Sequence, residues 1–289
     1  MDTRSEIRDF LTTRRAKIRP EEAGLATYGS RRVAGLRREE VAVLAGVSVP
    51  YYTRLERGDV RGVSESVLQA LARALQLDEA ERAYLFDLAR AAHSTTSPRR
   101  PQTKHHVRPS VQHVLDAITG AAAFVRNGRL DILAANQLGH ALYSDLFATP
   151  VRPANAAQFV FLDRRARDFY VDWDKAATDT VAVLRYEASR NPYARDFLDL
   201  VDGLSAQSDE FRSRWAVHNV RQHITGIKHF HHRAVGDLSL TYDRLELVAD
   251  PGLTMFTYTA EPGSRDEETL KLLGSWAATL DQATAAAPE

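Results

Sequence analysis

The sequence contains no cysteine. This absence excludes disulfide bonds, thiol nucleophiles and every zinc or iron–sulfur site that needs a cysteine ligand. The sequence also lacks a run of eighteen apolar residues, so it predicts no membrane-spanning helix. No apolar signal core follows the first residues, and we therefore expect a cytoplasmic protein.

The sequence has no net charge either, because 38 basic side chains balance 38 acidic ones. Counted separately, residues 1–108 contain 20 Lys and Arg against 14 Asp and Glu, and residues 109–289 contain 18 against 24. A part with a net charge of +6 joined to one of −6 indicates that the first binds a polyanion and the second does not. The hydrophobic content of 44% is typical of a globular protein.

Apolar periodicity divides the sequence into two domains and a linker. Residues 1–92 are predicted to form five short helices, including one over 36–45 and one that begins after Ser48 and ends at Gly58. Residues 93–109 have no periodicity and the composition of a linker. We therefore expect an all-α domain, followed by a second domain over residues 110–289.

The second domain is predicted to be α+β. Asn127-Gly128 is a strong hairpin signal, and a meander of strands follows a group of helices. This order favours an antiparallel sheet that carries its helices on one face. The predicted helices span 136–147, 156–170, 178–189, 193–204 and 209–218, and the later strands span 226–232, 237–242, 244–248 and 254–259.

The tripeptide Gly46-Val47-Ser48 lies between two short helices whose apolar positions match a helix-turn-helix. Ser48 can cap the second helix, which buries Tyr52 and Leu55 and leaves its other face free to enter a DNA major groove. A helical hairpin with a solvated basic face is the alternative that spacing alone leaves open. The candidate DNA-binding residues are Arg37, Arg38, Ser48, Val49, Pro50, Tyr51, Thr53, Arg54 and Arg57.

Longer blocks support the helix-turn-helix interpretation. Residues 35–42 (GLRREEVA), 44–48 (LAGVS) and 51–58 (YYTRLERG) resemble the XRE class of regulators, and within it the MmyB-like branch. The resemblance covers nearly all of residues 7–90. It implies that Glu56 pairs with an arginine of the first helix, for which Arg14 is the candidate.

Different roles are expected for the basic residues of this motif. Arg54 is the candidate for a base contact, because a bidentate arginine–guanine pair contributes about 1–3 kcal/mol of discrimination. Thr53, Arg57, Arg37 and Arg38 are candidates for phosphate contacts, which supply affinity without sequence preference.

Beyond the linker, short motifs such as Phe161-Leu162-Asp163, Asp172-Trp173 and residues 258–264 resemble the MmyB-type ligand-binding domain. This resemblance implies a PAS-like fold with a five-stranded antiparallel sheet, and a hydrophobic small molecule, such as a fatty acid, as ligand. Ala135 departs from the family, which usually has an aromatic residue there. Core packing of the aromatic candidates and surface positions for the polar ones remain open alternatives. The candidates are Phe124, Leu133, Tyr170, Trp173, Phe211 and Trp215 for an apolar tail, and Arg185, His218 and Arg221 for an anionic head.

Other chemistry finds little support in the sequence. Adjacent His231 and His232 point to opposite faces of a strand, so we predict no metal site. Glycine-rich nucleotide motifs and the nucleophile elbow are absent, which predicts no cofactor and no enzymatic activity.

We expect a transcription regulator that binds double-stranded operator DNA as a homodimer and has no membrane partner. Residues 110–289 are expected to hold the dimer, including a helix at 270–280 that could equally pack on its own sheet. The alternative is a non-enzymatic sensor or scaffold that acts mainly through protein–protein contacts.

Overall fold

The computed structural model divides the chain into two compact units, and each unit contains separate stretches of chain. The first unit is Met1–Arg99, Arg185–Asp202 and Ser213–Gln222, and the second is Arg100–Leu184, Gly203–Arg212 and His223–Glu289. The structure describes residues 3–26, 31, 33–93, 106–190, 194–220 and 224–286. Most of the predicted linker, 93–109, lies outside the described residues. The sequence-based division ended the first domain at residue 92 and so did not include Arg185–Asp202 or Ser213–Gln222 in it.

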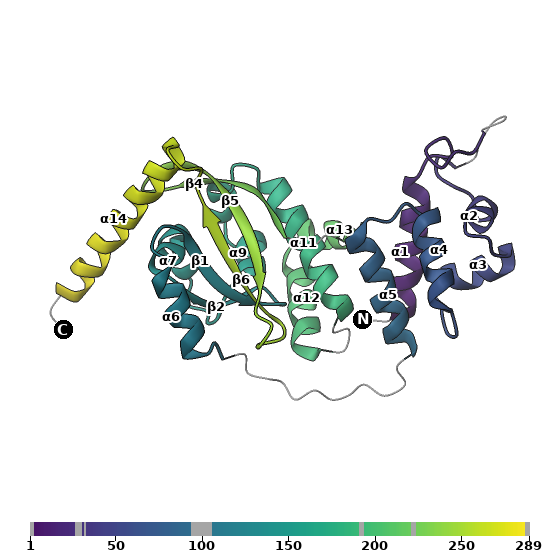
Figure 1. The fold of residues 1–289 in the computed structure, drawn as a ribbon, viewed down its shortest axis with the longest axis horizontal. Helices are drawn as coiled ribbons and strands as arrows, with labels where there is room; N and C mark the ends of the chain where they lie inside the picture. The colour runs from purple at the N-terminus through teal and green to yellow at the C-terminus, as the bar shows by residue number, and fades with distance from the viewer. Residues whose placement is uncertain are drawn as a thin grey trace. The chain divides into compact units, whose positions relative to one another are not determined.

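The first unit is helical, as predicted for its N-terminal part (Figure 1). Ser48 caps α3 by accepting a hydrogen bond from the Tyr51 amide at 3.3 Å, and Ser64 caps α4 in the same way. Helix α2 begins two residues later than predicted, because Arg37 adopts an extended backbone before it. The helices are α1 (Thr3–Lys17), α2 (Arg38–Leu44), α3 (Val49–Glu56), α4 (Glu65–Ala74) and α5 (Glu79–His93).

The core of the first unit includes side chains from much later in the chain. Tyr186 and Val220 are buried in the same cluster as Phe10 and Tyr84. Tyr186 lies near the end of α11 (Trp173–Arg190), and Val220 follows α13 (Asp209–Trp215). Helix α12 (Arg195–Gln207) also begins in this unit.

The second unit contains a six-stranded antiparallel sheet in the order β3-β2-β1-β6-β5-β4 (Figure 1). The predicted hairpin is confirmed, since Phe124 pairs with Ala135 across β1 and β2. Residues 237–242 and 244–248 were expected to form two strands, but Asp243 continues the ladder and β5 is one strand. The sixth strand, β3, is short and pairs with β2. The strands are β1 (Ala122–Asn127), β2 (Asp131–Ala135), β3 (Ala154–Asn155), β4 (Thr225–His232), β5 (Gly236–Glu246) and β6 (Leu253–Thr259).

The main core lies on one face of this sheet, where Phe124, Phe256 and Tyr258 pack against helices. Helix α6 (Pro109–Ala117) packs on the other face against Ala123 and Val125. The two long helices predicted at 136–147 and 156–170 are each interrupted, at Tyr143 and at Asp163. The resulting helices are α7 (Gln137–Leu142), α8 (Ser144–Phe147), α9 (Ala156–Leu162) and α10 (Arg165–Phe169). The all-α and α+β fold classes are thus confirmed.

The last helix, α14 (Arg265–Ala286), packs within its own unit. Leu270 and Leu273 are buried in the main core of the sheet. Of the two alternatives left open for this helix, packing on its own sheet is therefore the one observed. No helix in the described part of the chain is long and apolar enough to cross a membrane.

Candidate functional site

Helix α3 is held on its buried side by the carboxylate of Glu56. This group is 2% exposed and accepts hydrogen bonds from Arg15 Nε at 2.5 Å, from Arg38 Nε, and from the Tyr52 hydroxyl at 3.3 Å. Burial and the charge of Glu56 raise the pKa of Tyr52, so its hydroxyl remains protonated and able to donate. Three donors stabilise a buried charge that would be costly alone, and the two arginines among them fix α3 to α1 and α2.

The arginine of α1 that meets Glu56 is Arg15, and the expectation of Arg14 is wrong. Consecutive helix residues point about 100° apart, so only one of the two can face Glu56. Arg14 instead pairs with Glu81 of α5 and donates through Nη2 to the carbonyl oxygen of His218 at 2.7 Å.

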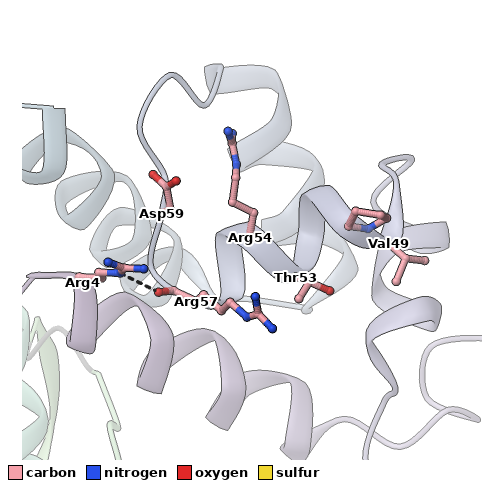
Figure 2. Close-up of a pocket in the computed structure, with 7 residues that line it drawn as sticks. Arg4, Val49, Thr53, Arg54, Arg57 and Asp59 are labelled. Carbon is pink, nitrogen blue, oxygen red and sulfur yellow. Dashed lines mark hydrogen bonds between the residues drawn. The ribbon is translucent and has the colours of Figure 1, made fainter.

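The opposite side of α3 is exposed and borders a hollow of about 460 Å³. Asp59 at its edge pairs with Arg61 at 3.0 Å, and this hydrogen bond lowers the pKa of Asp59. The Arg54 guanidinium lies 4.9 Å from the centre of the Tyr51 ring. Figure 2 shows the hollow, which is lined by Arg4, Val49, Pro50, Thr53, Arg54, Arg57 and Asp59. Its arginines make it a positively charged depression that suits phosphate groups or base edges.

Arg4 reaches this hollow because Gly58 lets the start of α1 approach the end of α3. Gly58 has a φ of +84°, and a Cβ there would lie 2.1 Å from the carbonyl oxygen of Arg4. Arg4 Nε donates to the carbonyl oxygen of Arg57 at 3.2 Å, the dashed line in Figure 2. Only glycine fits both the backbone conformation and the close approach.

The structure places the nine predicted DNA-binding residues on or next to α2 and α3. Arg37 is exposed at the start of α2, whereas Arg38 is engaged by Glu56. Upstream, Arg31 donates two hydrogen bonds to Glu40, at 2.7 and 2.8 Å, and these lower the pKa of Glu40 to about 2. The predicted residues that line the hollow are Val49, Pro50, Thr53, Arg54 and Arg57.

A cavity of about 50 Å³ lies in the second unit between the sheet and α11. It has room for a few water molecules, because each needs about 10–15 Å³. Strands β1, β2, β4 and β6 contribute to its walls, together with α9 and α11. Its lining residues are Phe124, Arg126, Leu130, Ile132, Tyr143, Ala156, Val160, Tyr170, Ala176, Asp179, Thr180, Val183, Lys228, Phe256 and Tyr258.

The polar groups of this largely apolar cavity are the tyrosine hydroxyls, Thr180 and three charged side chains, Arg126, Asp179 and Lys228. The Tyr143 hydroxyl donates to the Tyr258 hydroxyl at 3.2 Å. Burial raises the pKa of Tyr258 to about 12, so this hydroxyl is neutral at physiological pH. Burial also lowers the pKa of Lys228 to about 7, with a contribution from the charge of Arg126.

Of the eight predicted ligand-binding residues that the structure describes, Phe124 and Tyr170 line this cavity. Leu133 lies among the side chains on the α6 face of the sheet, because neighbouring residues of a strand point to opposite faces. Trp173 Nε1 donates to the Val160 carbonyl oxygen at 3.0 Å, and the Phe211 ring packs 5.1 Å from the ring of Phe161. Trp173 and Phe211 are therefore buried packing residues that do not line the cavity. Arg221 lies outside the described residues.

Three further predicted residues, Arg185, Trp215 and His218, belong to the first unit. Arg185 is fully buried, forms an ion pair with Glu6, and places its guanidinium 4.1 Å from the centre of the Trp215 ring. Tyr84 donates to the same Glu6 oxygen at 3.0 Å, and His218 Nδ1 lies 3.6 Å from it. Burial would raise the pKa of Glu6, but His218 and Arg185 outweigh it and lower the pKa.

Sequence reasoning missed Arg4, Arg126 and Lys228. A signal for Lys228 does exist, because β4 alternates and Lys228 shares a face with the buried Phe230. Arg126 lies in β1 on the face of Phe124, and the same alternation indicates it. For Arg4, only the close packing at Gly58 reveals the position.

Comparison with protein families gives two matches. Residues 107–273 match the model described as the MmyB-like transcription regulator ligand binding domain. Residues 4–85 match a helix-turn-helix domain. No curated protein matches the chain.

Proposed function

Because the chain belongs to the MmyB-like transcription regulators, we propose that the exposed face of α3 is its DNA-binding surface and that the cavity beside α11 is its ligand site. The regulator combines a helix-turn-helix with a ligand-binding domain. The observation that carries the DNA assignment is the two-sided character of α3. Glu56 fixes its buried side, and arginines surround the hollow on its exposed side.

In this proposal α3 enters the major groove of an operator, as in the XRE class. Arg54 reads a base, while Thr53, Arg57, Arg37 and Arg38 contact phosphates. Arg38 uses the guanidinium N–H groups that Glu56 does not occupy. The start of α3 lies against the groove, where the contacting residues are Ser48, Val49, Pro50 and Tyr51.

The ligand is a hydrophobic small molecule, with a fatty acid as the first candidate, bound in a PAS-like domain. Phe124 and Tyr170 support this assignment, since both line the cavity. Ligand pockets commonly have volumes of about 300–1,000 Å³, so a ligand must displace the walls of a cavity of about 50 Å³. Each buried methylene then contributes about 0.8 kcal/mol.

We further propose that the regulator is cytoplasmic, has no catalytic activity, and binds a palindromic operator as a homodimer. The side of α14 that carries Leu270 and Leu273 is buried within the second unit, so the dimer uses another surface of residues 110–289. Sedimentation of the full chain at micromolar concentration tests this assembly. A monomer with and without DNA would contradict it.

The DNA assignment is tested by selecting binding sequences from random duplexes with the full chain and then measuring affinity by fluorescence anisotropy. We expect Arg54→Ala to lose about 1–3 kcal/mol on the selected site and little on random DNA. Arg73→Ala is the matched control, because Arg73 is exposed on α4 outside the hollow. It should change neither affinity.

Two outcomes would contradict this assignment. Equal losses of Arg54→Ala on selected and random DNA would remove the base-reading role. Failure to select any DNA sequence would favour the sensor or scaffold that acts through protein–protein contacts.

A further inference from the structure

Lys228 of β4 places its side-chain nitrogen among aromatic rings at the wall of the cavity beside α11. Its Nζ lies 5.7 Å from the ring centre of Tyr242, 5.9 Å from that of Tyr258 and 6.0 Å from that of Tyr170. Tyr258 and Tyr170 line the cavity together with Lys228. A molecule that enters this cavity therefore meets the nitrogen in an apolar, aromatic setting.

The other described lysines have different surroundings. Lys175 and Lys271 each form an ion pair with a carboxylate of their own helix at 2.8 Å. Lys17 is exposed and donates to the side chain of Asn219 at 2.6 Å. Lys228 has no such ion pair among the residues that the structure describes. Of these four lysines it is the one that lines a cavity.

The position of Lys228 also changes its protonation. Its pKa is lowered from 10.5 to about 7, mainly by burial. The charges of Arg126 and Lys175 add to this lowering, and the charge of Asp179 opposes it. A large fraction of the amine is therefore neutral at physiological pH. A neutral lysine amine in an apolar pocket is the nucleophile that forms Schiff bases with carbonyl compounds.

We propose that this cavity captures an aldehyde with an apolar tail as a reversible Schiff base on Lys228, with the tail along Phe124, Ile132 and Val183. This inference rests on the proposed ligand site and names a second, covalent class of ligand for it. The lining suits an apolar tail, because most of its side chains are aliphatic or aromatic. An aldehyde is the matching head, because it condenses with an amine without prior activation, whereas an acid or an alcohol does not.

The condensation needs only the amine and the aldehyde. The nitrogen adds to the aldehyde carbon to form a C–N bond, and the carbonyl oxygen leaves as water with the two hydrogens of the amine. No electron donor or acceptor is consumed. The Tyr143 hydroxyl donates to the Tyr258 hydroxyl at 3.2 Å, and this pair can pass protons between the nitrogen and the leaving oxygen. Water that re-enters the cavity reverses the reaction, so occupancy follows the concentration of the aldehyde.

Reductive trapping on the full chain tests the proposal. Equimolar dodecanal with sodium cyanoborohydride at about pH 7.5 should attach one dodecyl group, and peptide mass mapping should place it on Lys228. Propanal should attach far less, because each buried methylene of the tail raises affinity by about fourfold. Isothermal titration with dodecanol measures, on the same chain, the binding of an equal tail without a carbonyl group.

Two other lysines separate the site from general lysine reactivity. Partial burial and the charge of Arg14 lower the pKa of Lys17 as well, so exposed Lys17 tests whether a lowered pKa alone directs the aldehyde. Lys271 is an exposed lysine of α14, and Lys271→Met should be trapped as the wild type is.

Variants at Lys228 remove the nucleophile in two ways. Lys228→Met should abolish the trapping, and its folding is checked by circular dichroism. Lys228→Arg should abolish it too, because a guanidinium stays protonated and forms no Schiff base. Trapping that survives in both variants would contradict the proposal.

Equal dodecyl labelling of Lys228, Lys17 and Lys271 in the wild type would overturn the proposal, and so would equal labelling of Lys228 by propanal and dodecanal. Binding of dodecanol without trapping of dodecanal would also overturn it, and it would leave the ligand site of the proposed function intact. Binding of neither molecule would overturn the ligand part of the proposed function together with this inference. None of these results would affect the DNA assignment.

Discussion

Arg185 and Glu6 are 179 positions apart in the sequence and form a buried ion pair within one compact unit. Arg185 comes from α11, and Glu6 from α1. The carbonyl oxygen of Trp215 accepts a second hydrogen bond from Arg185, and Tyr84 donates to Glu6. The pair therefore fastens the first helix to a segment from the second half of the chain.

This pair predicts a large loss of stability when one partner is removed. We expect Glu6→Gln to lower the free energy of unfolding by about 3–5 kcal/mol, because it leaves a buried guanidinium without its counter-charge. Urea unfolding of the full chain measures it. The control is Asp209→Asn, which breaks the exposed pair with Arg212 and should cost less than about 1 kcal/mol. In the double variant with Arg185→Met, stability should partly return, and strict additivity of the two losses would argue against the pairing.

The two glycines near the end of α3 predict different responses to alanine. Gly62→Ala should cost about 1–2 kcal/mol, since Gly62 has a φ of +72° but open space where a Cβ would lie. Gly58→Ala has the same backbone strain, and its Cβ would also lie 2.1 Å from the carbonyl oxygen of Arg4. It should therefore lower the free energy of unfolding clearly more than Gly62→Ala does. Urea unfolding compares the two. Equal costs would show that the approach of α1 to α3 does not depend on Gly58.

The lowered pKa of Lys228 predicts how Lys228→Met changes stability with pH. The unfolded chain binds a proton at this lysine up to its usual pKa of 10.5, whereas the folded chain releases it near pH 7. The wild-type lysine therefore opposes folding most below pH 7, and its cost fades as pH rises toward 10.5. Lys228→Met should raise the melting temperature at about pH 6.5 more than at about pH 10. A difference that does not change with pH would contradict the lowered pKa.

A phosphate contact by Arg57 predicts a change in the salt dependence of DNA binding. Arg57→Ala should weaken binding to selected and to random duplexes by the same factor. It should also flatten the slope of log K against log salt by about one unit. Arg73→Ala should leave the slope unchanged. Anisotropy titrations over a range of salt concentrations measure both. A loss confined to the selected site would instead give Arg57 a base-reading role.

Local patterns made the helix-turn-helix predictable. Gly46 at the turn and Ser48 as a cap act over a few residues, and both occur as expected. The choice of Arg15 over Arg14 as partner of Glu56 depends on how α1 is rotated against α3. The spacing of residues along the sequence does not determine that rotation.

The polar ligand candidates show more strongly that sequence patterns do not determine which residues meet in the fold. Arg185 was a reasonable partner for an anion, and it does bind a carboxylate, but that of Glu6. Nothing local indicates a contact over such a separation. Lys228 was overlooked because it lies between the exposed Ile227 and His229, although the alternation of β4 turns it toward the cavity.

The make-up of the first unit also bears on whether its DNA-binding part can be treated as an exchangeable module. A protease cut or a gene fusion placed after residue 93 would retain α1 to α5 but discard Arg185, Tyr186 and Val220. Glu6 would lose its counter-charge, and the apolar groups of α1 and α5 would be opened to water. The helix-turn-helix of this chain is therefore completed by sequence that the ligand-binding domain carries, and transplanting it to another sensor requires transplanting those residues as well.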